Sequence, residues 1–217
     1  RRVLEKGKIP PEQICGIGID GQSWSQLPLI RMEKYLQIPL YGWTQEHNLS
    51  ATELNKEIGA EQIFEVSGNS LQPSYTTAKI IWYKEKLPEI YGKIYKVLQS
   101  NSYIAYKLTG SISQDVSQGY GLHCFRMREG IWDKEMCQKL GIPMEFLPDI
   151  VNCDTVVGTV TAKGYEQVKS IGVEGNSSWW LAVWMLPVEH LGWSDPSRRD
   201  PGTGRTGRWN EHLHGHL

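Results

Sequence analysis

The chain has 217 residues, enough for one large domain or two small ones around a buried core. Its 23 basic and 24 acidic residues give a net charge of −1, which offers no general attraction to nucleic acid or to an anionic membrane. The first residues lack the apolar region of a signal peptide, and no later stretch is long enough to span a bilayer. A small neutral partner therefore fits better than a nucleic acid or a membrane.

The cysteines are widely spaced, at Cys15, Cys124, Cys137 and Cys153. They form neither the CxxC pairs of zinc and redox sites nor a disulfide-dense pattern. The HLHGH string near the C-terminus resembles a metal cluster but lacks a supporting fold, so we assign no metal site. A reducing cytoplasmic location is the simplest interpretation of this cysteine usage.

A short apolar run near the N-terminus, ICGIGID (Ile14–Asp20), is interrupted by glycine and stops at Gly21 and Gln22. This pattern is typical of a buried parallel strand that ends in a loop. Open α/β sheets bind ligands at the loops that follow the carboxyl ends of such strands. We therefore predict that Ile14–Ile19 forms a strand of a mixed sheet and that a binding loop follows it.

The middle of the chain has helical periodicity. One helix is predicted from Ala51 to a stop at Gly68. Further helices are predicted over Thr76–Glu85 and Pro88–Gln99, because proline is favoured in a first turn, and a third helix ends at Gly110. The first of these helices should place four apolar residues on one face: Leu54, Ile58, Ile63 and Phe64.

The last regular segments are shorter. WDKEMCQKLGI is predicted to be a helix, Val156–Thr161 to be a strand because of its β-branched residues, and Ala162–Gly172 to be a helix. Asp115, in the string QDVS, is interpreted as a helix N-cap rather than as a catalytic group.

Several of these strings together resemble a known family. SYTTAKIIWYKEKLPEIY, YKLTG, QDVSQGYG, GIWDKEMCQKLGI and LPDIV before VVGTVT occur in the order seen in the FGGY carbohydrate kinases. The order is more specific than any single motif, because Lys79 and Trp82 alone could form an ordinary helix face. The resemblance implies an α/β, actin-like (ribonuclease H-like) fold, with residues 1–175 forming a partial N-terminal, sugar-side domain.

The resemblance also implies an activity. Kinases of this family transfer the terminal phosphoryl group of ATP, with Mg²⁺, to a hydroxyl of a sugar or polyol, and here a xylulose-like pentulose is expected. The family's DxGT hairpin and its nucleotide domain are not found in the sequence. The chain is therefore expected to be inactive alone and to bind ATP and Mg²⁺ poorly, although the intact protein could form a homodimer. The alternative is a non-catalytic sugar-binding or interaction module on half of the same fold.

Two segments depart from the family pattern, Leu27–Ser50 and Asn176–Leu217. When the third base of each codon is joined to the first two of the next, the Met32–Glu33 junction must encode glycine and the Trp43–Thr44 junction aspartate. The Trp184–Met185 junction must also encode aspartate, within a string that can read VAGGLDAACGTLG. We therefore predict that both segments are translated out of frame, and that the second is poorly packed or exposed.

Two other interpretations of the C-terminal segment remain. GRTGRWN mixes cations with an aromatic residue, as RNA-binding arms do, but the segment has few cations and many large apolar residues. Its tryptophans could instead contact a membrane surface, but they lack an amphipathic period.

The candidate substrate-binding residues lie in the loop after the first strand: Asp20, Gln22, Ser23 and Trp24. Gln22 matches the GQ of the family, which lies near the sugar, and its amide can donate and accept hydrogen bonds. Trp24 could form a wall for a sugar ring or pack in the core, and Asp20 could contact a hydroxyl or cap a turn. Ser23 and Trp24 depart from the GQMHG common in xylulokinases, which leaves the exact sugar open. No catalytic residue is assigned, because the aspartate of the family's GGxDA motif is not present in frame.

Overall fold

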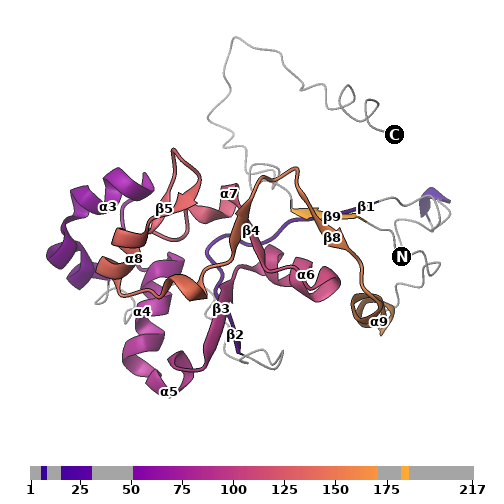
Figure 1. Ribbon diagram of the computed structural model, residues 1–217, viewed down its shortest axis with the longest axis horizontal. Coiled ribbons are helices and arrows are strands. Elements are labelled where there is room, and N and C mark those ends of the chain that lie inside the picture. Colours follow the sequence, from indigo (N-terminus) through magenta and orange to yellow (C-terminus); the bar gives the residue numbers. More distant parts are fainter. Residues whose placement is uncertain (1–5, 9–15, 31–50, 171–181, 186–217) are drawn as a thin grey trace, which may run out of the picture.

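The computed structural model describes residues 6–8, 16–30, 51–170 and 182–185. These residues form a helical part and a part built on a small sheet, which lie side by side (Figure 1). The helical part contains α3 (Ala60–Ser67), α4 (Thr76–Lys86), α5 (Pro88–Tyr91) and α8 (Lys134–Leu140). The sheet part contains β1 (Gly16–Ile19), β8 (Val156–Thr159) and β9 (Ala182–Met185), with α6 (Ser100–Thr109) and α9 (Ala162–Ser170) beside them.

Shorter elements connect these parts. Strand β2 (Leu27–Ile30) pairs antiparallel with β3 (Ile94–Leu98), and β4 (Ser113–Asp115) pairs parallel with β7 (Asp149–Val151). The one-turn helix α7 (Val116–Gly119) follows β4 directly. The hairpin of β5 (Phe125–Arg126) and β6 (Ile131–Trp132) leads into α8, and a short 3₁₀ turn, η3 (Met144–Phe146), precedes β7.

The predicted first strand is confirmed where it is described. β1 covers Gly16–Ile19 and pairs in parallel with β9, which pairs antiparallel with β8, so the strand order is β1-β9-β8 in a mixed sheet. Ile14 and Cys15 lie outside the described residues. Ile19 is buried against α6, in a small apolar cluster with Ala105, Leu108 and Val160.

One part of the C-terminal segment that was expected to be poorly packed or exposed forms regular structure. Ala182–Met185 is the central strand of the sheet, and the packing expected of the segment as a whole stays a prediction. Strand pairing uses backbone N–H and C=O groups, which every residue except proline supplies, so a segment can pair whatever its side chains were selected for. The rest of Asn176–Leu217 lies outside the described residues, and the out-of-frame interpretation of both segments stays a prediction.

The predicted helix over Pro88–Gln99 is wrong beyond its first turn. The helix α5 ends at Tyr91, and Ile94–Leu98 forms β3 instead. The sequence IYKVL is rich in β-branched and aromatic residues, and pairing with Leu27–Ile30 removes the backbone groups of both strands from water. Pairing with a strand that is distant in the sequence therefore determined the conformation of this segment, against the local helical pattern.

The first predicted helix is confirmed, but one of its core residues is not. Residues 51–67 are helical, with a π-helical turn, η2, over Asn55–Gly59, and the helix ends at Gly68 in the left-handed conformation. Ile63 is fully buried, whereas Phe64 is 53 % exposed. The π turn and the positive φ of Gly59 (97°) interrupt the regular α-helical period, so the four apolar residues no longer share one face.

The remaining helix boundaries follow their local signals. Asp133 caps α8 by accepting a hydrogen bond from the Met136 N–H at 2.7 Å, and α6 ends at Gly110 with a φ of 80°. The predicted last strand and helix appear as β8 and α9. No helix among the described residues is long and apolar enough to cross a membrane.

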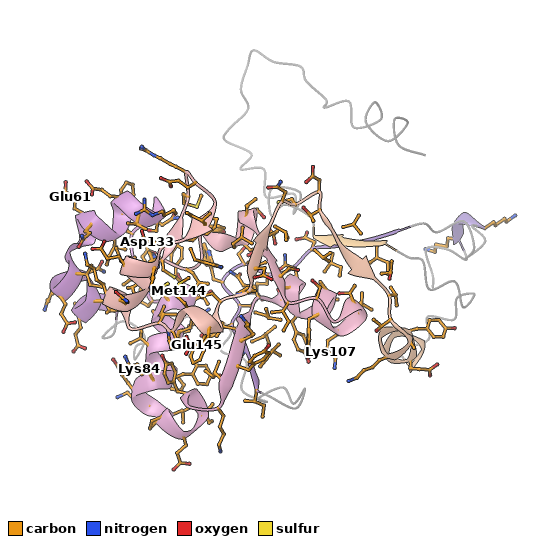
Figure 2. All side chains as sticks on the ribbon, viewed as in Figure 1. Glu61, Lys84, Lys107, Asp133, Met144 and Glu145 are labelled. Atoms are coloured by element: carbon orange, nitrogen blue, oxygen red, sulfur yellow. The ribbon has the colours of Figure 1, made fainter. Side chains whose placement is uncertain are left out.

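The main core lies in the helical part, where side chains fill the space between the helices (Figure 2). It continues toward the middle of the molecule, where α4 and the segment after α7 meet. Its buried members include Ile63, Ala78, Ile80, Leu122, Cys124 and Leu140. This packing fixes α4, whose first turn supports the candidate site.

Candidate functional site

The loop after β1 is held on the first turn of α6. The Ser25 hydroxyl accepts a hydrogen bond from the Ser100 N–H at 2.9 Å, and the Ser100 hydroxyl donates to the Gln22 carbonyl at 3.1 Å. Gly21 permits this approach, because a Cβ on it would lie 2.4 Å from Ser100 Oγ and 2.7 Å from Asn101 N. The loop is thus fixed by the body of the protein at the carboxyl end of β1.

Trp24 lies at the turn of this loop in an unusual backbone conformation. Its φ is 59°, in the left-handed region that residues with a side chain seldom adopt. Its indole packs on the ring of Tyr75, with centroids 4.6 Å apart and planes 31° apart, and it meets Tyr120 edge-on at 6.0 Å. All three rings are only half-buried, so this aromatic cluster presents ring surface to the outside.

Buried polar groups without partners surround the cluster. The indole N–H of Trp24, the hydroxyl of Thr76 and the side-chain amide of Gln118 have no hydrogen-bond partner among the described residues. A Cβ on Gly121 would lie 3.2 Å from Trp24 Cδ1 and 3.3 Å from Thr76 Oγ1, so the edge of the Trp24 ring and the Thr76 hydroxyl both lie next to this glycine. Unpaired buried donors and acceptors are rare in native proteins, and a ligand rich in hydroxyl groups would satisfy them.

Tyr75 and a neighbouring histidine have shifted pKa values in this cluster. Burial raises the pKa of the Tyr75 phenol, and the neighbouring Tyr120 raises it further. His123 packs against Tyr75, with centroids 5.0 Å apart, and is fully buried. Burial lowers the pKa of His123 to about 4, although the Ser70 carbonyl offsets part of this shift. The rings of the cluster are therefore uncharged at pH 7, whereas the Lys79 ammonium contacts the Trp24 carbonyl beside them.

The predicted site residues lie in one loop, but their side chains differ in exposure and in hydrogen bonding. The Gln22 side chain is exposed at the surface of the loop, and Ser23 beside it is half-buried. The Asp20 carboxylate accepts a hydrogen bond from the Gly21 N–H at 2.7 Å, as expected of a turn cap. A substrate contact by any of these residues, or by Trp24, stays a prediction.

Sequence reasoning missed the partners of Trp24. Tyr75 and Tyr120 occur within the quoted strings SYTTAK and QGYG, but neither string indicates that their rings meet the loop after β1. Lys79 was treated as part of an ordinary helix face, yet it is buried and donates to the Trp24 carbonyl at 2.6 Å. A buried lysine one turn after Tyr75 has no sequence signal of its own.

Asp115 caps a helix, as predicted, and so supports the helix beside the candidate site. Its fully buried carboxylate caps α7 by accepting from the Gln118 N–H at 3.1 Å. It also accepts from Asn101 Nδ2 at 2.8 Å, from the Ser117 hydroxyl and from Cys153 Sγ at 3.7 Å. This network fixes the helix that carries Gln118 into the candidate site.

Two surface cavities lie elsewhere. One of about 570 Å³ is lined by residues that include Lys96, Ser113 and Asp149, and another of about 700 Å³ by residues that include Tyr91 and Phe146. Neither is lined by a buried polar group that lacks a partner. We therefore place the candidate site at the aromatic cluster.

In the part of the chain that the structure describes, no group of three or more His, Cys, Asp or Glu side chains is placed to hold a metal ion.

The chain is similar to known carbohydrate kinases. Residues 1–175 match the model of the N-terminal domain of the FGGY family of carbohydrate kinases. A xylulose kinase of Staphylococcus xylosus is 27 % identical over 165 residues, which cover 75 % of this chain and 33 % of that protein. A glycerol kinase of Cereibacter sphaeroides is 26 % identical over 193 residues, covering 81 % of this chain and 37 % of that protein. The chain spans about a third of the length of these relatives.

Solved structures share the fold. A xylulose kinase from Rhodospirillum rubrum superposes with a TM-score of 0.70 at 23 % identity, over 79 % of this chain and 34 % of that one. A gluconate kinase from Lactobacillus acidophilus gives a TM-score of 0.69 at 22 % identity, over 82 % of this chain and 35 % of that one. The predicted α/β, actin-like fold of a sugar-kinase N-terminal domain is thereby confirmed.

Proposed function

Because this chain belongs to the FGGY family of carbohydrate kinases, we propose that it is the sugar-side part of an ATP-dependent kinase whose acceptor is a pentulose. The observation that carries the proposal is the half-exposed cluster of Trp24, Tyr75 and Tyr120, with unpaired polar groups beside it. Relatives named xylulose kinases favour a xylulose-like sugar over a longer one. Neither the relatives nor the fold favours the alternative of a non-catalytic module.

The proposed binding mode follows from the chemistry of these groups. Aromatic faces suit the C–H surfaces of a sugar, so the Trp24 ring would form the wall. The exposed Gln22 amide can donate to one hydroxyl and accept from another. Together these contacts would orient the hydroxyl that accepts the phosphoryl group.

The phosphoryl donor belongs to the family rather than to the described residues. FGGY kinases use ATP, normally with Mg²⁺, and ATP supplies the terminal phosphoryl group. Because the chain spans about a third of its relatives' length, we propose that transfer requires the rest of the kinase. This chain would contribute the position of the sugar, which is the part of catalysis that depends on proximity and orientation. A cytoplasmic location also remains part of the proposal.

Saturation-transfer NMR on the 217-residue chain tests the sugar site directly. We expect transfer from the protein to D-xylulose, a weaker signal with Gln22→Ala, and loss of the signal with Trp24→Ala. Glu61→Ala serves as a control, because Glu61 is exposed on α3, away from the loop (Figure 2). Equal signals from Trp24→Ala and from the unmodified chain would show that the sugar does not bind at this cluster.

A second experiment tests the requirement for the missing length. With ATP, Mg²⁺ and D-xylulose, the chain alone should form no ADP above background, because loss of a catalytic base alone lowers a rate by ~10²–10⁴-fold. A gene extended and repaired to the family's full length should recover sugar-dependent ADP formation. In that protein, Gln22→Ala should weaken sugar binding more than ATP binding. Turnover by the 217-residue chain would contradict the proposal.

A further inference from the structure

Lys79 is a buried cation that contacts the backbone of the candidate sugar loop. It lies in α4 with 2 % of its surface exposed, and its Nζ donates to the Trp24 carbonyl oxygen at 2.6 Å. Among the described residues, no ion pair joins it to a carboxylate. Burial lowers the pKa of Lys79 to about 8, which reflects the cost of keeping an ammonium in the interior. The hydrogen bond to the Trp24 carbonyl offsets part of the cost of burying this charge.

Gln99 contacts the other side of the same residue. Its side chain is buried, and its Oε1 accepts a hydrogen bond from the Trp24 N–H at 3.0 Å. Its Nε2 donates to the Gln118 carbonyl at 2.7 Å, which fixes the orientation of the amide. The backbone N–H and C=O of Trp24 are thus both bound by buried side chains from other elements.

These two contacts explain how Trp24 keeps its conformation. A φ of 59° is unfavourable for a residue with a large side chain, and such conformations persist only where the surroundings determine them. Lys79 comes from α4, and Gln99 is the residue between β3 and α6, so both stand on elements that are fixed by the core. Their contacts can therefore select the left-handed conformation over the relaxed alternatives.

We propose that Lys79 and Gln99 are positioning residues that hold Trp24 in its left-handed conformation and so fix its ring for the sugar. The effect on sugar binding rests on the proposed function, whereas the hold on Trp24 does not. Neither side chain needs to touch the ligand. Each binds a peptide group of Trp24 and thereby fixes the position of its half-exposed ring.

The hold on Trp24 can be measured without any ligand. The chain is labelled with 5-fluorotryptophan, and its ¹⁹F resonance from position 24 is assigned with Trp24→Phe. Lys79→Met should shift or broaden that resonance, and Lys79→Arg, which keeps N–H donors, should return it toward its original position. Lys84→Met is the matched control, because Lys84 is exposed on the same helix (Figure 2). An unmoved Trp24 resonance in folded Lys79→Met would overturn the proposal.

Titration with D-xylulose then separates this proposal from the proposed function. Lys79→Met should weaken binding roughly tenfold or more, since hydrogen bonds to charged groups are the stronger ones, while Lys84→Met should bind as the unmodified chain does. If the Trp24 resonance moves in Lys79→Met but neither the unmodified chain nor Lys84→Met binds the sugar, the hold is supported and the proposed function is wrong. If the unmodified chain binds and Lys79→Met changes neither resonance nor affinity, the hold is wrong and the sugar site stands.

A second variant covers the case in which Lys79→Met does not fold. Gln99→Leu removes the other contact and should displace the same resonance; a folded Gln99→Leu with an unmoved resonance would contradict the proposal. The unmodified chain gives a further test, because a Trp24 N–H bound to Gln99 should be protected from hydrogen exchange. Rapid exchange of that amide would also overturn the proposal.

Discussion

Acidification should destabilise this fold through His123. The neutral imidazole is buried, with its Nδ1 3.0 Å from the Thr77 hydroxyl, and burial lowers its pKa from 6.5 to about 4. Between these values the unfolded chain binds a proton that the folded chain does not, so stability falls as the pH falls from 6.5 toward 4. At about pH 4.5, two units below the unfolded value, one such group lowers the free energy of unfolding by about 2.5 kcal/mol.

Urea denaturation followed by circular dichroism measures this effect. The unmodified chain and His123→Gln are compared at about pH 7 and about pH 4.5, and the difference in unfolding free energy between the two pH values is taken for each. The unmodified chain should lose about 2.5 kcal/mol more than the variant. Paired carboxylates such as Asp133 also lose stability in acid, but they are common to both proteins and cancel. Equal losses in the two proteins would refute the argument from burial.

Two further predictions compare a buried residue with an exposed one. Asp115→Ala should lower the free energy of unfolding by about 3–5 kcal/mol, because it leaves several buried donors unpaired, whereas Asp149→Ala on the exposed surface should change it by about 0.5 kcal/mol or less. Ile63→Ala should cost about 2–5 kcal/mol through the cavity it creates, and Phe64→Ala, next to it but facing solvent, should cost about 1 kcal/mol or less. Urea denaturation measures all four, and a buried variant as stable as its exposed counterpart would contradict the core described above.

The elements that could be predicted from sequence are those set by local signals. Asp115 and Asp133 cap helices and Gly110 ends one, because a cap depends on residues within one turn. Ile94–Leu98 was missed as a strand because its partner, β2, lies far away in the sequence. The β-branched and aromatic residues of IYKVL are compatible with a strand, but the proline before them favoured a helix, so the local pattern alone could not decide between the two.

The candidate site shows the same limit more sharply. The loop from Asp20 to Trp24 was predicted because loops after parallel strands bind ligands, which is a rule of topology, and its role in binding stays a prediction. Tyr75, Tyr120 and Lys79 were missed as its neighbours because the fold alone brings them to the loop. The left-handed conformation of Trp24 also has no sequence signature, since no glycine or asparagine stands at that position.

The contacts around Trp24 have a consequence for how such a site could change in evolution. Lys79 and Gln99 bind only the main-chain oxygen and nitrogen of residue 24, and every amino acid except proline offers both. The shape of the loop would then be inherited separately from the side chain that it displays. Mutation could exchange the displayed group, and with it the preferred sugar, while the scaffold stays intact. Such a division would let distant relatives that keep one fold diverge in their substrates.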